Sequence, residues 1–119
     1  MTGNVYLRRI VSLCSYLAMS YKEQFNQMEG FVRWNLPEEL GLEWIDAEYI
    51  IFQAPELSNV LTEEQKNILY KIYNNFLSAF DKKTDSEVWT HEAMQTHPFW
   101  QKQRTLARQF LELNATAQQ

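Results

Sequence analysis

Apolar residues recur every three or four positions along most of the chain, which is the spacing of one face of an α-helix. The first such stripe predicts a helix over residues 5–29. Asn4 is a suitable N-cap, and Gly30 is suited to the left-handed residue that ends a helix. The stripe consists of Leu7, Ile10, Val11, Cys14, Leu17, Ala18, Tyr21, Phe25 and Met28.

A second helix is predicted to begin at Pro37, after a short connection over residues 31–35. Proline suits the first turn, where its missing N–H would have no partner, and the two glutamates that follow favour the positive end of the helix dipole. Gly41 weakens this helix by about 1 kcal/mol relative to Ala. The segment 48–53, EYIIFQ, fits either a short strand or another helical turn, and Pro55 ends it. The inner face of the helix comprises Leu40, Trp44 and Ala47.

The third helix has the clearest start. Thr62 and Gln65 have the spacing of a capping box, in which a hydroxyl side chain and a side chain three residues later cap each other's backbone N–H groups. A polar turn is expected over residues 81–85. The wide apolar face between them predicts the central core helix and consists of Ile68, Leu69, Ile72, Tyr73, Phe76, Leu77 and Phe80.

Two further helices complete the pattern. A short one is predicted over 86–96, with Val88, Trp89, Ala93 and Met94 buried. His97-Pro98 ends it and begins the last helix, whose final residues, 114–119, should fray. Lys102, Arg104 and Arg108 are expected on the outer face of that helix. Its inner face is predicted to comprise Phe99, Trp100, Leu106, Ala107, Phe110, Leu111 and Leu113.

These elements predict one all-α domain, a compact bundle of about five helices, in which the segment near residues 48–53 is either a short irregular or extended piece or a further helical turn. A chain of 119 residues is long enough for a single core. No run reaches the ~18 apolar residues of a membrane span. The apolar run after Arg8-Arg9 imitates a secretion signal, but Ser12, Ser15 and Tyr16 interrupt it, so we interpret it as part of the first helix.

Charge is unevenly distributed. Residues 34–65 hold eight acidic residues and no Lys or Arg, whereas the rest of the chain has eleven basic and seven acidic residues. The net charge of −4 therefore combines a −8 middle with a +4 remainder. An acidic surface interleaved with aromatic side chains suits contact with a basic protein, and the overall charge argues against general nucleic-acid binding. An exposed Trp34 or Trp44 would be a candidate interface anchor.

Candidate chemistry is sparse. His91 and His97 do not have metal-ligand spacing, the glycines form no phosphate-binding loop, and Cys14 lies on an apolar stripe. We therefore expect no catalytic residue, no cofactor and no metal, and interpret the chain as a binding protein. Two other hypotheses are an enzyme with an unrecognised carboxylate pair and an RNA-binding bundle that uses the basic residues around Trp100.

The succession of segments resembles a known family. The segments are LRRIVSLCSYL, LPEELGLEWIDAEYI, LTEEQKNILYKIYNNFLSAF, WTHEAM and HPFWQKQRTLARQFLEL. Together they resemble the small all-helical immunity proteins of bacterial contact-dependent growth inhibition (CDI) systems. The closest likeness is the tail pattern Trp100, Arg104, Leu106-Ala107-Arg108 and Phe110-Leu111. The run Pro37-Glu38-Glu39 with Trp44-Ile45-Asp46 is next.

This resemblance implies a cytoplasmic protein that binds the C-terminal toxin domain of a CDI system one-to-one and neutralises it, with no direct contact to nucleic acid or membrane. Many such toxins are nucleases, including tRNA-cleaving ones, and a nuclease groove is basic because it holds phosphates. The alternative is an acidic helical adaptor or regulator whose partner is not a toxin. The expected partner-binding residues are Glu38, Glu39, Glu43, Trp44, Asp46, Glu48 and Glu56.

Overall fold

The computed structural model describes residues 4–81 and 87–117. All regular structure in these ranges is helical, which confirms the predicted all-α class. The helices are α1 (Val5–Ala18), α2 (Tyr21–Gln27), α3 (Gly30–Trp34), α4 (Leu36–Asp46), α5 (Glu48–Phe52), α6 (Pro55–Ser58), α7 (Glu63–Asp81), α8 (His91–Thr96) and α9 (Pro98–Ala117).

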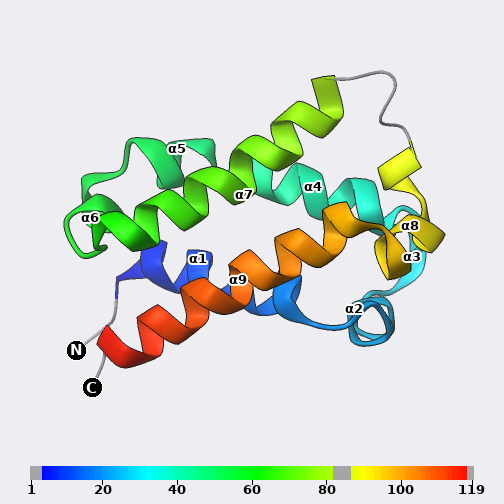
Figure 1. Cartoon of the computed structure of the whole chain (residues 1–119), viewed down its shortest axis with the longest axis horizontal. Coiled ribbons are helices and arrows are strands. Elements are labelled where there is room, and N and C mark those ends of the chain that lie inside the picture. The colour runs from blue at the N-terminus through cyan, green and yellow to red at the C-terminus, as the bar shows by residue number, and fades with distance from the viewer. Residues whose placement is uncertain (1–3, 82–86, 118–119) are drawn as a thin grey trace.

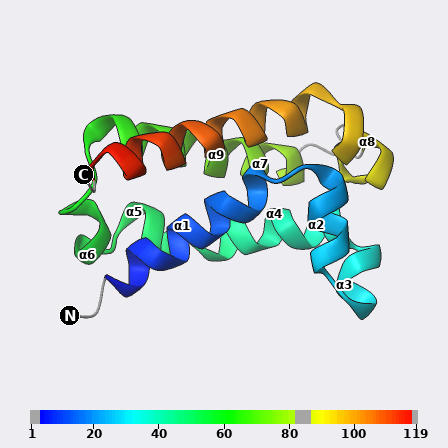
Figure 2. The same ribbon diagram turned by 90° about the horizontal axis from the view of Figure 1, so that it is seen from below.

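Four of these helices, α1, α4, α7 and α9, form a closed ring around the core. Helix α9 packs against both α1 and α7, and α4 packs against both α7 and α1 (Figures 1 and 2). The short helices lie at the two ends of this ring. Helices α5 and α6 lie at one end, and α2, α3 and α8 lie at the other (Figure 2). The segment 48–53, for which strand and helix were both possible, is helical over Glu48–Phe52.

Phe76 of α7 lies at the centre of the core and is fully buried. Its ring centroid lies 5.6 Å from that of Trp100, 5.7 Å from that of Phe99 and 6.4 Å from those of Trp44 and Trp89. Such ring pairs add roughly 0.5–1.5 kcal/mol each beyond the area they bury. The predicted inner faces of α4, α7 and α9 therefore meet around one aromatic centre.

The single helix predicted over 5–29 is wrong, because the chain breaks after α1 and begins again as α2. Ser20 is the reason. Its hydroxyl accepts from the backbone N–H of Glu23 at 3.2 Å, and the Glu23 carboxylate accepts from the N–H of Ser20 at 3.2 Å, which is a complete capping box. Gly30 does adopt a positive φ of 58°, but it begins α3 and does not end the first helix. Helix α3 covers most of the segment 31–35 that was predicted to be a connection.

Three of the other predicted helix starts are confirmed. Thr62 and Gln65 form the capping box before α7, with hydrogen bonds of 2.8 and 3.1 Å, and Pro37 and Pro98 lie in the first turns of α4 and α9. The helix predicted over 86–96 is instead a single 3₁₀ turn over 87–89 followed by α8, with Thr90 as the N-cap of α8. Residues 114–117, which were expected to fray, continue α9, and residues 118–119 lie outside the described ranges. Residues 82–85 of the predicted polar turn also lie outside those ranges.

Gly41 has a packing role that the sequence pattern did not reveal. A Cβ atom at this position would lie 2.8 Å from two ring carbons of Trp89 and 3.0 Å from a ring carbon of Phe80. The Trp89 and Phe80 rings themselves stack with centroids 4.2 Å apart. The glycine therefore lets this ring pair approach the backbone of α4.

The expectation that Arg104 points outward is wrong. Its side chain is only 6% exposed, and it bridges α9 to the segment that follows α1. The guanidinium donates to the backbone oxygen of Met19 at 3.1 Å and to the side-chain oxygen of Gln24 at 3.0 Å. Burial, and secondarily the nearby positive charge of Arg108, lower the pKa of Arg104. Arg108 and Lys102 are exposed, as expected.

Candidate protein-binding surface

The exposed face of α4 is acidic. One turn of helix separates neighbours at steps of three and four residues, so Glu38, Glu39 and Asp46 all lie next to Leu42 on the helix surface. Leu42 is 43% exposed, while Leu40 and Trp44 on the opposite face are buried. The result is one exposed apolar side chain with carboxylates around it.

Glu43 lies on the α1 side of this face. Its carboxylate pairs with the guanidinium of Arg9 at 2.5 Å, and both side chains are about half exposed (47% and 51%). Exposed ion pairs of this kind contribute about 0–1 kcal/mol. Arg9 therefore neutralises one of the four acidic residues of α4 without holding it strongly.

The two remaining predicted acidic residues follow α4 in the chain. Glu48 begins α5 and lies beside the hydroxyl of Tyr73, whose pKa is raised by burial and, to a lesser degree, by this carboxylate. The Glu56 side chain is exposed in α6, and its backbone oxygen accepts a hydrogen bond from the side chain of Asn4. The acidic residues thus extend from α4 over the α5–α6 end of the molecule and do not form a single compact cluster.

Trp44 has to be removed from the predicted contact residues. Its side chain is fully buried between α4 and α7, with its ring centroid 6.4 Å from that of Phe76. Its indole N–H has no hydrogen-bond partner within the described part of the chain. A residue in this position supports the surface from below but does not reach a partner.

Trp34 is the exposed tryptophan of the acidic segment, with 71% of its side chain accessible. One contact to its ring and one to its backbone hold this residue in place. Its ring meets that of Phe25 edge-on at 6.4 Å, and its backbone oxygen accepts from Nε2 of His91 at 2.8 Å. Because a carbonyl oxygen only accepts, Nε2 of His91 carries the proton when the ring is neutral, and Nδ1 accepts from the hydroxyl of Tyr21 at 2.7 Å. An exposed, held tryptophan is a common interface anchor.

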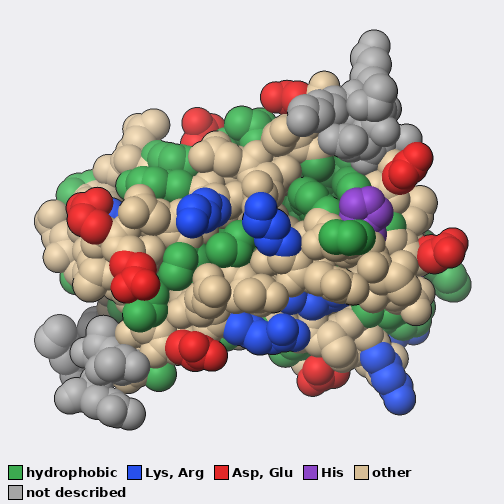
Figure 3. Space-filling view, viewed as in Figure 1, with side chains coloured by type: hydrophobic (Ala, Val, Ile, Leu, Met, Phe, Trp, Pro, Cys, Tyr) green, Lys and Arg blue, Asp and Glu red, His purple; other side chains and the backbone are tan. Residues whose placement is uncertain are grey.

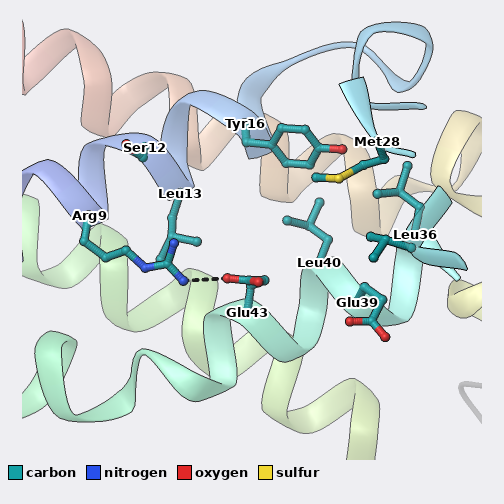
Figure 4. Close-up of a pocket in the computed structure, with 10 residues that line it drawn as sticks. Arg9, Ser12, Leu13, Tyr16, Met28, Leu36, Glu39, Leu40 and Glu43 are labelled. Carbon is teal, nitrogen blue, oxygen red and sulfur yellow. Dashed lines mark hydrogen bonds and ion pairs between the residues drawn. The ribbon is translucent and has the colours of Figure 1, made fainter. Parts of the chain in front are cut away.

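A hollow of about 330 Å³ opens between α1, α3 and α4 beside the acidic face. Figure 4 shows Arg9 and Glu43 reaching toward each other across the gap between α1 and α4, with Tyr16, Met28 and Leu40 grouped further along it. Glu39 and Glu43 are the carboxylates at this hollow. Its apolar lining consists of Leu13, Met28, Val32, Leu36 and Leu40.

Basic residues are concentrated elsewhere. Lys and Arg side chains lie along α7 and α9 on the face seen in Figure 3, while α4, α5 and α6 contain none. The uneven charge of the sequence is therefore also uneven in space. The hypothesis of RNA binding requires an accessible aromatic ring among the basic residues around Trp100. Trp100 does not supply it, because its side chain is fully buried and its indole N–H donates to the backbone oxygen of Val88 at 2.6 Å.

The residues considered for chemistry are held in structural roles. Cys14 is fully buried, as predicted, and burial raises the pKa of its thiol. Within the described ranges, no group of three or more His, Cys, Asp or Glu side chains is placed to hold a metal ion. None of the helices in those ranges is both long enough and apolar enough to cross a bilayer.

Sequence reasoning missed two parts of this surface. Leu42 could have been found, because it falls on the opposite side of the helix from Leu40 and Trp44. The hollow could not have been found from the sequence, because its walls come from three different helices, α1, α3 and α4. Its shape also depends on the end of α1 at Ala18, which the sequence pattern did not predict.

Comparison with known proteins adds no assignment: no protein-family model, curated protein or solved structure matches the chain.

Proposed function

We propose that this protein is an immunity protein of the CDI type, which neutralises a basic toxin domain by binding it through the acidic face of α4. The proposed toxin is a nuclease, and the proposed complex is one-to-one and cytoplasmic. The proposal rests on the layout of helices and tail residues described above together with the charge and shape of this face.

The observation that carries the proposal is the arrangement around Leu42. Its 43% exposed side chain is bordered by the carboxylates of Glu38, Glu39 and Asp46, on a helix that has no Lys or Arg. An apolar centre with a charged border is the usual composition of a protein interface. A nuclease groove offers the complement, since cationic side chains that hold phosphates would meet these carboxylates.

The Arg9–Glu43 pair and the hollow behind it extend this surface. An exposed ion pair is weak, so a basic side chain of the partner can replace Arg9 at little cost. The aliphatic part of that side chain would lie against Leu13 and Leu40, with its charge beside Glu39 and Glu43. A standard interface covers about 800 Å² on each partner, which is enough for α4 and this hollow together.

The test is calorimetric titration with the toxin domain encoded next to this protein's gene, at low and at moderate salt. The native protein should form a one-to-one complex whose affinity falls as salt rises, because screening weakens interactions beyond about 8 Å at physiological ionic strength. The charge-reversed variant Glu39→Lys/Glu43→Lys/Asp46→Lys should bind at least 100-fold more weakly, since apposed like charges cost several kcal/mol.

A matched control reverses three exposed charges elsewhere, as Glu64→Lys/Glu87→Lys/Glu92→Lys, and should retain affinity. Both variants must keep the native helical circular dichroism spectrum. Tight binding that neither triple variant weakens would keep the immunity function and move the contact away from α4. No binding by the native protein would overturn the function itself.

A further inference from the structure

A further hollow, of about 430 Å³, lies where α9 meets α8 and the start of α2. Its cationic lining is formed by Arg104 and Arg108, which lie one turn apart on α9. Ser20 and Tyr21 at the start of α2, and Gln95 of α8, contribute polar side chains. This site shares no residue with the acidic face of α4.

The two guanidinium groups are held by neutral oxygens. Arg104 donates to the backbone oxygen of Met19 and to the amide oxygen of Gln24, and Arg108 donates to the backbone oxygen of Ala18 at 3.3 Å. The ion pairs in the described part of the chain involve Arg9 and Lys66, and neither Arg104 nor Arg108 is among them. Among the described residues, these two formal positive charges therefore lie together without a carboxylate paired to either.

This arrangement is unusual for Arg104, which is 94% buried. A buried charge normally has an opposite charge as its partner, because neutral groups replace only part of its hydration. The lining residue Ser20 does bond to a carboxylate, that of Glu23, which accepts from the hydroxyl and backbone N–H of Ser20 and caps α2. The Glu23 carboxylate is used in this cap and pairs with neither arginine, so both guanidinium groups remain available to an external anion.

We propose that this hollow binds a phosphate group, with Arg104 and Arg108 as its two cationic ligands. A phosphate near neutral pH carries up to two negative charges, which match two guanidinium groups, whereas a single carboxylate matches one. Planar guanidinium groups also bind phosphate oxygens through paired N–H donors, which favours this ligand over a spherical anion such as chloride.

The test uses inorganic phosphate, titrated into the full chain at constant ionic strength with chloride as the balancing anion. Binding is followed by the nitrogen-15 NMR signals of the arginine Nε–H groups and of the α9 backbone. The native protein should show saturable shifts of the Arg104 and Arg108 signals. The Arg108→Gln variant should bind about tenfold more weakly, since one charge-assisted hydrogen bond is lost.

Lys102→Gln is the matched control, because Lys102 is an exposed cation on the same helix but does not line the hollow, and it should bind like the native protein. Arg108 is exposed, so its replacement should leave the circular dichroism spectrum unchanged. Shifts that do not saturate, or that are equal in the two variants, would overturn the proposal. Equal affinity for acetate would also overturn it, because that would make the site a general anion site.

Discussion

The guanidinium of Arg104 in α9 donates a 3.0 Å hydrogen bond to the side-chain oxygen of Gln24 in α2, and both side chains are buried. The amide of Gln24 in turn donates to the backbone oxygens of Tyr16 and Leu17 at 3.0 and 3.1 Å. The last carbonyls of α1 therefore find their donors on α2 and α9. Positive charge at this end also opposes the negative pole of the helix dipole.

Replacing Arg104 with Met should therefore destabilise the protein strongly. The change leaves the oxygens of Met19 and Gln24 buried without their donor, at about 1–3 kcal/mol for each unsatisfied group. We expect the free energy of unfolding, measured in urea, to fall by about 3 kcal/mol. Lys102→Met, an exposed site on the same helix, should change it by less than ~0.5 kcal/mol. Similar losses in the two variants would contradict the role of this network.

Gly41→Ala should destabilise the protein although alanine is the better helix former. The new Cβ would meet the Trp89 ring at 2.8 Å, and overpacking of a core costs roughly 1–3 kcal/mol, more than the gain of about 1 kcal/mol in helix propensity. We expect a net loss of about 1 kcal/mol in urea unfolding.

A double-mutant cycle with Trp89→Leu identifies the cause of that loss. Removing the indole ring removes the two 2.8 Å contacts and leaves the 3.0 Å approach to a Phe80 ring carbon, so in the Trp89→Leu background Gly41→Ala should cost clearly less than in the native protein. A loss of the same size in both backgrounds would place the strain elsewhere.

Gly41 also illustrates which features of the fold could be predicted from the sequence and which could not. The apolar stripes predicted α4, α7 and α9 and most of their inner faces, because burial of one helix face is a local, periodic requirement. Leu77 of α7 was assigned to the inner face but is 37% exposed. The apolar stripe continues across Ser20, so the pattern did not reveal the Ser20–Glu23 capping box that divides α1 from α2. Gly41 could be recognised as a weak point of the helix, but its packing partner Trp89 is distant in sequence.

The negative charge of the candidate surface could be predicted from the sequence, but which aromatic and basic side chains are exposed was not predicted correctly. Composition predicts that carboxylates lie at the surface, since they are rarely fully buried, and Glu38, Glu43, Asp46, Glu48 and Glu56 are exposed while Glu39 is half-buried. The apolar pattern already placed Trp44 on the inner face of its helix, so choosing it as a contact residue went against that pattern, and the fold puts Trp44 in the core and Trp34 at 71% exposure. Arg104 was assigned to the wrong face because a buried arginine depends on carbonyls that only the tertiary structure supplies.

Tyr16 should make stability depend on pH in the alkaline range. Its hydroxyl donates to the backbone oxygen of Gln24 at 2.6 Å, and burial raises its pKa to about 12 from a usual value near 10. The folded protein thus holds this proton more tightly than the unfolded chain does. The stabilisation is complete below pH ~10 and is lost as pH rises toward ~12.

The measurement is urea unfolding of the native protein and of Tyr16→Phe between pH 8 and pH 12. At pH 8 the variant should be less stable by about 1 kcal/mol, because the hydrogen bond is lost. The difference between the two proteins should shrink as pH rises. Tyr21 and Tyr73 also have raised pKa values but are present in both proteins, so they cancel in the comparison. A difference that is constant with pH would refute the assignment.

Leu42 gives the most direct test of the proposed interface, because it is apolar and its replacement leaves every charge in place. Truncating a central apolar contact of an interface commonly costs 1–2 kcal/mol or more, so Leu42→Ala should weaken toxin binding by about tenfold or more. Leu77→Ala is the control, since Leu77 of α7 is similarly exposed at 37% and lies outside the acidic face. Both variants should unfold at nearly the native urea concentration. If Leu42→Ala binds normally while the charge-reversed α4 variant does not, the contact is electrostatic and α4 lies at the rim of the interface, with its apolar centre to be sought at Trp34.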